Sequence, residues 1–241
     1  MNLARSFDRA AEAYERGRPG WAPEAIDAVG LPADAVVLDL AAGTGKLTRQ
    51  LVPRFARVVA VEPLDRMRAV LERVVPKAEA LVGTATAIPL EDGAVDAVFV
   101  AEAFHWFARD EAVAEIARVL RPRGFLAILF NEHDGFEPAL PDAFWEVLDA
   151  AALEKPPEQS VRSGLWRSPF PGPFEPFADE SFPNLAEVDR EGLLALVASW
   201  STVAGLPEAE RVGLLERLAE LVPEDRYLHP LRTHLSLTRL R

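Results

Sequence analysis

Cysteine is absent from the 241 residues of this chain. Its absence excludes disulfide bonds, thiolate metal ligands and a cysteine nucleophile, and it fits the cytoplasm, where we expect the protein to act. The sequence also lacks a run of about 20 apolar residues, the length that crosses a bilayer. Its first residues contain no apolar signal segment. We therefore expect no membrane partner.

Positive charge is scarce. The 26 Lys and Arg residues are outnumbered by 38 Asp and Glu residues, which leaves a formal net charge of −12. Such a chain has no electrostatic attraction for nucleic acid, so we expect no nucleic-acid partner. His, Asp and Glu nowhere cluster at metal-ligand spacing, and we expect no metal site.

The most informative stretch begins with a short apolar run at 36–40, which is typical of a strand buried on both faces. A turn containing Gly43 and Gly45 follows, and helical spacing resumes from Lys46. Glycine lets a backbone approach a ligand closely, and the free N–H groups of a helix start can bind one. This turn is predicted to bind a small molecule.

The spacing of the turn indicates which small molecule. A dinucleotide fingerprint requires G-x-G-x-x-G, but Thr48 stands where the third glycine would be. An acidic residue, Asp39, stands on the strand instead, and a carboxylate suits a cationic ligand and repels a pyrophosphate. The D-x-A-x-G-x-G run resembles the first motif of class I S-adenosylmethionine-dependent methyltransferases, which usually have glycine at the first small position. The resemblance implies an S-adenosylmethionine cofactor held by Asp39, Ala41, Gly43, Thr44 and Gly45.

A second buried-strand run, 57–63, ends in the carboxylate of Glu62 followed by Pro63. In nucleotide-type sites an acid at the end of the second strand binds both ribose hydroxyls, because a carboxylate offers two adjacent acceptors. The alternative is that Glu62 caps the next helix, with Pro63 at its first position. Both roles are compatible.

A third strand over 78–83 leads into Gly83-Thr84-Ala85-Thr86-Ala87-Ile88-Pro89-Leu90. This segment resembles the family's Gly-Asp-Ala-x-x-Leu-Pro-Phe, whose acid meets the adenine amino group. Thr84 replaces that acid and is a weaker acceptor than a carboxylate. The adenine contact is therefore expected from Thr84 and the backbone of Ala85.

The fourth strand, 95–101, runs into Glu102 and then Phe104-His105-Trp106-Phe107. Chemistry in α/β sheets lies at the carboxyl ends of the strands, so Ala101 and Glu102 are expected at the cofactor. His105 is expected to remove a proton from the acceptor or to orient it; the alternative is a histidine bonded to backbone. Ala-Phe-His-Trp-Phe also resembles a run in the subgroup that includes trans-aconitate methyltransferases.

The leading segment is predicted to be a helix over 5–16. Phe-Asp-x-x-Ala-x-x-Tyr-x-x-x-Arg-Pro-Gly resembles a segment that folds over the cofactor in small-molecule methyltransferases. The resemblance implies that Tyr14 acts at the catalytic site and that Arg18 contacts the cofactor. The alternative is that Tyr14 only packs and Arg18 is solvated.

These elements predict an α/β fold: a Rossmann-like, doubly wound, seven-stranded and mostly parallel sheet with an antiparallel closing strand and a helical cap. Helices are expected over 64–75 and 109–120, a fifth strand over 125–130, and closing strands near 182–188 and 231–240, with two helices between them. We expect three regions: 1–30 covering the cofactor, 31–135 forming the core, and 136–241 forming the cap and closing strands.

We therefore predict a methyltransferase that moves a methyl group from S-adenosylmethionine to an oxygen, or to nitrogen or carbon, of a small acceptor. A carboxylic acid is one candidate, and the aromatic-rich segment 131–222 is expected to enclose the acceptor. The alternatives are a non-catalytic S-adenosylmethionine-binding regulator and a nicotinamide-dependent reductase. A monomer and a homodimer are both compatible with the sequence.

Overall fold

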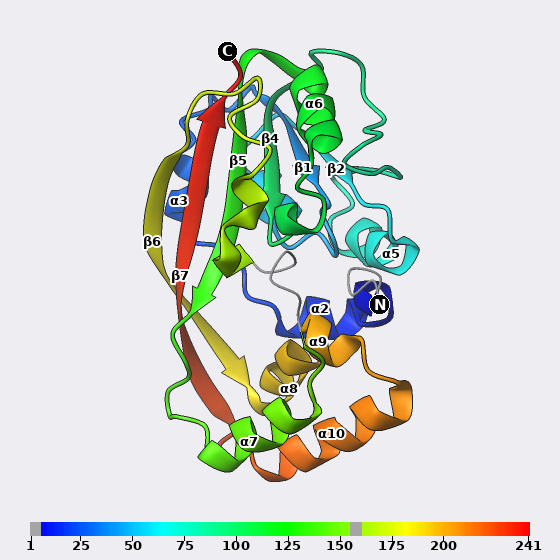
Figure 1. Ribbon diagram of the computed structural model, residues 1–241, viewed down its shortest axis with the longest axis vertical. Helices are drawn as coiled ribbons and strands as arrows, with labels where there is room; N and C mark the ends of the chain where they lie inside the picture. Colours follow the sequence, from blue (N-terminus) through cyan, green and yellow to red (C-terminus); the bar gives the residue numbers. More distant parts are fainter. Residues whose placement is uncertain (1–5, 155–160) are drawn as a thin grey trace.

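The computed structural model describes residues 6–154 and 161–241, and in these residues seven strands form one sheet in the order β3-β2-β1-β4-β5-β7-β6 (Figure 1). Six strands run parallel to one another, and β7 is antiparallel to both of its neighbours. The bounds are β1 Val36–Leu40, β2 Arg57–Val61, β3 Glu79–Leu81, β4 Val95–Ala101, β5 Leu120–His133, β6 Ala178–Asp189 and β7 Arg226–Arg239. The predicted fold class is confirmed.

The strand order reverses between β1 and β4. β1 pairs with β2 on one side and with β4 on the other, and both pairings are parallel. At such a switch point the connections leave the two strands in opposite directions, which opens a crevice at their carboxyl ends. The Gly turn after β1 and the segment after β4 therefore begin at the same place.

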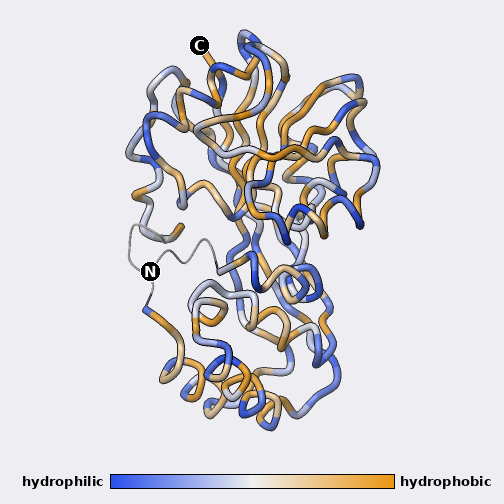
Figure 2. The backbone as a smooth tube through the Cα atoms, turned by 90° about the vertical axis from the view of Figure 1, so that its right-hand side faces the viewer, coloured by the Kyte–Doolittle hydropathy of each residue, from blue (hydrophilic) through white to orange (hydrophobic). Residues whose placement is uncertain are grey.

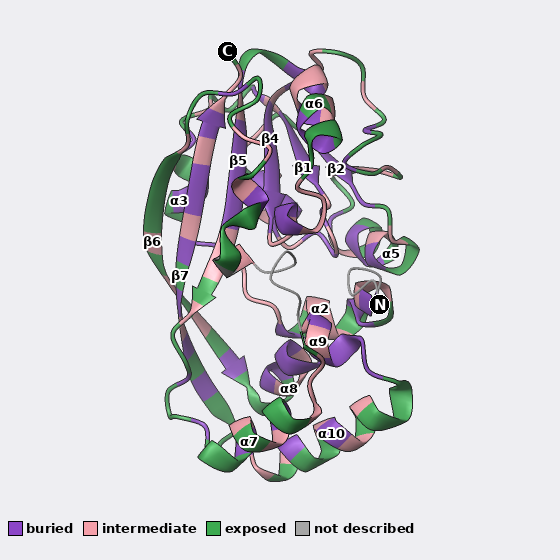
Figure 3. Cartoon of the chain, in the orientation of Figure 1, coloured by how far each residue is buried: buried purple, intermediate pink, exposed green. Residues whose placement is uncertain are grey.

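Two apolar layers cover the sheet, because alternate strand residues point to opposite faces. Leu38 and Val98 pack with α6 (Asp110–Val119) on one face. Val37 and Phe99 pack with α3 (Pro23–Asp27) and α4 (Thr48–Leu51) on the other. Figure 3 shows the inner strands buried almost throughout, and Figure 2 shows apolar residues concentrated along them.

The strands β6 and β7 extend beyond the sheet as a long ribbon towards a helical cap (Figure 1). The cap has its own apolar core, in which Phe144, Leu193, Leu214 and Tyr227 are fully or almost fully buried. Its helices are α7 Asp142–Ala151, α8 Arg190–Ala198, α9 Ser201–Ala204 and α10 Glu208–Glu220. The sequence predicted only two helices between the closing strands; α9 is one turn long, too short to produce a helical period.

The N-terminal segment folds as two short helices, α1 Ser6–Arg9 and α2 Ala11–Gly17, where one was predicted; Arg5 lies outside the described residues. Both contact α5 (Asp65–Val74), and α2 also crosses α8 of the cap. A Cβ atom on Gly17 would lie 2.1 Å from the backbone nitrogen of Leu196. Only glycine permits this crossing, which holds the N-terminal cover against the cap.

This crossing predicts opposite effects of one substitution at two helical glycines. Gly17→Ala is expected to destabilise the protein by about 1–3 kcal/mol, because the backbones must separate to admit the methyl group. Gly213→Ala, where nothing lies within 4 Å of the new Cβ, is expected to stabilise it by about 0.5–1 kcal/mol. Urea unfolding measures both. Destabilisation of equal size at the two positions would contradict the close crossing.

Candidate cofactor and acceptor site

A cavity of about 680 Å³ opens at the carboxyl ends of β1, β2 and β4, under α1 and α2. This volume falls within the range of about 300–1,000 Å³ that is usual for small-ligand sites. The lining residues come from the N-terminal cover, from the ends of three strands and from the cap: Phe7, Asp8, Tyr14, Arg18, Ala41, Gly43, Glu62, Pro63, Leu64, Asp65, Met67, Ala101, Glu102, Ala103, His105, Trp106, Phe107 and Ser201. The cavity thus occupies the crevice of the switch point.

The Gly turn contributes Ala41 and Gly43 to the cavity, and both have left-handed backbone angles, with φ of 59° and 58°. Nothing lies within 4 Å of a Cβ built on Gly43, so its backbone faces open space. Gly45, with φ of 83°, does not line the cavity, and a Cβ there would press on Leu71 of α5 at 3.1 Å. Gly43 therefore leaves room for a ligand to approach the backbone, whereas Gly45 allows the turn to pack closely against α5. Thr44 is fully buried behind the turn and also does not line the cavity.

Glu62 is the buried acid of the cavity, with 4% of its surface exposed. Its Oε2 accepts the N–H of Gly43 and its Oε1 accepts the N–H of Leu64, each at 2.8 Å. Burial raises the pKa of Glu62, while these two backbone hydrogen bonds lower it. The carboxylate thus holds the start of the next segment and also faces the cavity. α5 begins at Asp65, so Pro63 precedes the helix and does not occupy its first position as the alternative expected. Pro63 lines the cavity next to it.

Asp39 does not line the cavity, in contrast to the prediction. Its side chain is buried, with 1% of its surface exposed, and its Oδ2 accepts a hydrogen bond of 2.6 Å from Thr48 Oγ1. Thr48 is the residue that replaces the third glycine of a dinucleotide fingerprint. The pair joins the end of β1 to the first residue of α4, so Asp39 shapes the turn from behind.

Burial also predicts a pH-dependent stability at this position. It raises the pKa of Asp39 from 3.8 to about 7, although the Thr48 hydrogen bond lowers it. Between these values the folded chain keeps a proton that the unfolded chain has lost. The side chain of Asp39→Asn has no such proton to lose. As pH rises from about 4 to about 7, the free energy of unfolding of the wild type should therefore fall relative to that of the variant by about 1.4 kcal/mol per pH unit. Urea unfolding across this range measures the difference, and parallel curves would contradict the raised pKa.

The predicted helix start also differs in detail. α4 begins at Thr48, not at Lys46, and spans a single turn. The N–H of Gly43 is taken by Glu62, and the N–H of Gly45 by the carbonyl of Ala42. A one-turn helix has little dipole to offer, so the turn contributes close backbone approach and not an anion site.

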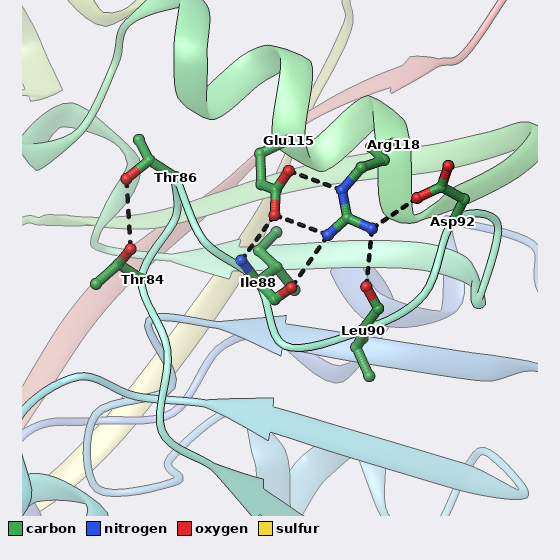
Figure 4. Close-up of polar contacts among 7 residues, drawn as sticks. All are labelled: Thr84, Thr86, Ile88, Leu90, Asp92, Glu115 and Arg118. Atoms are coloured by element: carbon green, nitrogen blue, oxygen red, sulfur yellow. Dashed lines mark hydrogen bonds and ion pairs between the residues drawn. The ribbon is translucent and has the colours of Figure 1, made fainter.

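The segment after β3 is held away from the cavity wall. Thr84 is exposed and Ala85 is buried in the core, and neither lines the cavity, so the adenine contacts implied by the resemblance are not formed by its walls. Arg118 of α6 uses all five of its N–H groups, three of them on this loop and two on Glu115 of its own helix (Figure 4). They are donated to the carbonyls of Ile88 and Leu90 and to the carboxylates of Asp92 and Glu115.

Tyr14 and Arg18 both line the cavity. The Arg18 guanidinium lies 5.3 Å from the Tyr14 ring centroid, and its Nε donates to Ser199 Oγ at 2.8 Å. Burial raises the pKa of Tyr14 to about 12, although Arg18 lowers it. The phenol therefore keeps its proton near neutral pH, which makes Tyr14 a hydrogen-bond donor and excludes it as a general base.

The segment after β4 supplies the remaining wall. Ala101, Glu102 and His105 line the cavity. His105 is 8% exposed and its ring lies 4.8 Å from that of Trp106. Glu102 has a left-handed φ of 58°, and its Oε1 accepts the N–H of Asn131 at 2.6 Å.

Several lining residues were missed by sequence reasoning. The ring of Phe7 meets those of Tyr14 and Trp106 edge-on at 6.0 and 5.8 Å. Phe7 and Trp106 stood within the quoted motifs, so their positions could have been inferred. The contributions of Leu64, Asp65, Met67 and Ser201 depend on how α5 and the cap pack, and no motif marked them.

The aromatic residues of 131–222 do not enclose the cavity, in contrast to the prediction. Trp166 and Phe170 pack on Phe104 at 6.0 and 5.5 Å, and Phe177 packs on both of them. They complete the core on one face of the sheet because helices alone do not cover it. Of the described residues in 131–222, only Ser201 lines the cavity.

In the described ranges, no group of three or more His, Asp and Glu side chains is arranged to hold a metal ion. No helix of the described chain has both the length and the apolar character needed to cross a bilayer.

Comparison with known proteins decides the family. Over 222 residues the chain is 40% identical to an uncharacterized methyltransferase of Mycobacterium tuberculosis, covering 92% of this chain and 87% of the relative. The chain belongs to the class I S-adenosylmethionine-dependent methyltransferases. A family model described as a methyltransferase domain matches residues 38–128 of this methyltransferase.

More distant proteins agree. An uncharacterized methyltransferase-like protein of Schizosaccharomyces pombe is 33% identical over 219 residues, covering 87% of this methyltransferase and 84% of the relative. A structure from Anaeromyxobacter dehalogenans, assigned to the type II methyltransferases, is 25% identical with a TM-score of 0.61 and covers 92% of this methyltransferase and 96% of that chain. The trans-aconitate branch is not distinguished by these relatives.

The family and the fold imply S-adenosylmethionine as cofactor, and the cavity residues fit it. Gly43 leaves open space where any other side chain would stand. Each oxygen of Glu62 accepts one backbone N–H, and a carboxylate oxygen can accept a second donor such as a ribose hydroxyl. Arg18 offers a cation for the carboxylate of the methionine part.

Proposed function

We propose that this enzyme transfers a methyl group from S-adenosylmethionine to an oxygen atom of a small-molecule acceptor, with nitrogen and carbon as alternative target atoms. The observation that carries the proposal is the composition of one cavity. Glu62 and Gly43 stand on its side nearest β1 and β2, and His105, Phe7 and Trp106 form another part of its wall. A cofactor and a small acceptor would thus share one cavity.

When bound, the cofactor supplies a methyl group on a sulfonium, which is a good leaving group. Glu62 binds the ribose hydroxyls, and Arg18 binds the carboxylate of the cofactor. Pro63, Ala101 and Glu102 complete the cofactor wall. No protein nucleophile is required, because alignment of the reactants in a water-excluding cavity lowers the barrier by as much as about 7–11 kcal/mol.

His105 takes the acceptor's proton as the new bond to the methyl carbon forms. Imidazole suits this task because its unperturbed pKa of about 6.5 lets it accept a proton near neutrality. If the acceptor is already an anion, such as a carboxylic acid at neutral pH, no base is needed and His105 orients it. Tyr14 donates a hydrogen bond, since its raised pKa excludes a role as base.

Incubation with methyl-labelled S-adenosylmethionine and a panel of phenols, alcohols, amines and small carboxylic acids tests the proposal. We expect label in at least one small product and none in oligonucleotides. Methylation of tRNA or DNA oligonucleotides faster than of any small compound would contradict it. Binding of S-adenosylhomocysteine without turnover of any panel member would favour the non-catalytic regulator.

A further inference from the structure

We infer that Ser199, the residue that follows α8 in the helical cap, is a positioning residue for the cofactor. It holds the Arg18 guanidinium in the orientation that binds the cofactor's carboxylate. The inference rests on the proposed function and adds the residue on which the Arg18 contact depends. It is carried by the hydrogen bonds between Arg18 and Ser199 and by the close packing of α2 on α8.

Ser199 is fully buried at the C-terminal end of α8. Its Oγ donates its one proton to the carbonyl of Leu196 at 2.6 Å, so this oxygen can only accept from any other group. It accepts the Nε–H of Arg18 at 2.8 Å, and the Ser199 carbonyl accepts a second, longer bond of 3.3 Å from Nη2. Ser199 therefore binds the Nε–Nη2 edge of the guanidinium through both its side chain and its backbone.

This arrangement determines which part of the guanidinium a ligand can reach. Arg18 lines the cavity, and its guanidinium also lies 5.3 Å from the centroid of the Tyr14 ring. The bonds to Ser199 use neither the N–H groups of Nη1 nor the second N–H of Nη2. These groups form the end of the guanidinium that can bind both oxygens of a carboxylate. We assign the carboxylate of the cofactor's methionine part to this end.

The backbone that carries Arg18 is fixed against the same helix. Gly17 crosses α8 so closely that a Cβ atom would lie 2.1 Å from the backbone nitrogen of Leu196. Leu196 is also the residue whose carbonyl accepts the Ser199 hydroxyl. The crossing and the hydrogen bonds therefore meet at one turn of α8, which places Ser199 next to the chain that precedes Arg18.

The bonds to Ser199 order the Arg18 side chain before a cofactor arrives. Immobilising a long side chain on binding costs free energy, and a side chain that is already held in its bound conformation avoids this cost. Loss of the Ser199 hydroxyl should therefore weaken the recognition of a carboxylate in particular. The alternative is that Ser199 only ends α8, and its replacement would then affect the cap without any selectivity for a carboxylate.

Two ligands that differ by one group separate these roles: S-adenosylhomocysteine and its decarboxylated analogue. The analogue keeps the adenosine, the thioether and the amine and lacks only the carboxylate. Calorimetric titration into wild type and Ser199→Ala gives all four Kd values. We expect Ser199→Ala to weaken S-adenosylhomocysteine binding at least about fivefold and to change the Kd of the analogue by less than about twofold.

Ser236→Ala is the matched control. Ser236 is also buried, and its Oγ also accepts an arginine N–H at 2.8 Å, from Arg167, but it lies outside the cavity. Its replacement should leave both Kd values unchanged.

Two variants of Arg18 test the same chain of contacts. Arg18→Lys keeps the positive charge as a point charge without the planar fork, and it should weaken S-adenosylhomocysteine binding selectively, as Ser199→Ala does. In Arg18→Ala, the additional change Ser199→Ala should cause no further loss, because Ser199 acts through the guanidinium.

An unchanged ratio of the two Kd values in Ser199→Ala overturns the inference. If that variant does not fold, full S-adenosylhomocysteine affinity in Arg18→Lys overturns it instead. In either case, binding of S-adenosylhomocysteine to wild type leaves the proposed function standing. Failure of S-adenosylhomocysteine to bind the wild-type protein would be a failure of the proposed function itself.

Discussion

Replacing Glu62 by alanine is expected to weaken S-adenosylhomocysteine binding at least about 10-fold with the fold intact. A hydrogen bond to a charged group contributes about 1.5–3 kcal/mol, and Glu62 has two oxygens for the ribose diol. The substitution also frees the N–H groups of Gly43 and Leu64, which now hold the turn. Calorimetric titration measures the loss.

Two further variants separate the loss of the ribose contact from a general effect of changing an acidic residue. Glu62→Gln retains one carbonyl acceptor and should lie between alanine and wild type. Glu79→Gln, on the neighbouring strand β3 and outside the cavity, should bind like wild type. Because burial raises the pKa of Glu62 and the diol donors prefer a carboxylate, wild-type affinity should rise with pH as Glu62 ionises. Unchanged affinity in Glu62→Ala would show that the ribose lies elsewhere.

His105→Ala is expected to lower kcat by about 10²–10⁴-fold, the usual contribution of general-base catalysis. The wild-type rate should fall at acidic pH, because a protonated imidazole cannot accept the acceptor's proton, and this fall should be absent from the variant. S-adenosylhomocysteine affinity should change little, since the proposed contact is with the acceptor. The pH–rate profile of both proteins is the measurement.

His234→Ala is the matched control. His234 stacks on Phe130 at 4.8 Å and does not line the cavity, so its replacement should leave rate and pH profile unchanged. If His105→Ala keeps full turnover with the wild-type profile, His105 is a packing residue at the end of β4 and the assignment is wrong.

The fold was predictable where a residue pattern is compatible with only one secondary structure. Apolar runs predicted β1 and β4 with their bounds, because such runs are typical of buried parallel strands. The run at β2 predicted the start of that strand, but β2 ends at Val61, before Glu62. The closing strands were expected but are longer than predicted. The missed residues include 178–181 of β6, which are all exposed, and 226–230 of β7, of which only Tyr227 and His229 are buried, so hydrophobic pattern alone could not find these ends.

The site was predictable only at strand ends. Glu62 follows β2 directly, His105 stands four residues after the end of β4, and topology brings both to one cavity. Asp39 also stands near the end of a strand, but Thr48 draws its carboxylate away from the cavity, and a motif does not reveal which side of a turn an acid faces. Likewise, the Trp166 and Phe177 rings pack in the core. Whether an aromatic residue packs in the core or lines the cavity depends on the three-dimensional packing, which the sequence pattern does not show.

The central claim is that the cavity under α1 and α2 binds S-adenosylmethionine and not a nicotinamide dinucleotide. Calorimetric titration of the wild-type protein with S-adenosylhomocysteine and, separately, with NADH tests it most directly. We predict saturable binding of one S-adenosylhomocysteine per chain and no binding of NADH. Saturable binding of NADH, with none of S-adenosylhomocysteine, would contradict the account.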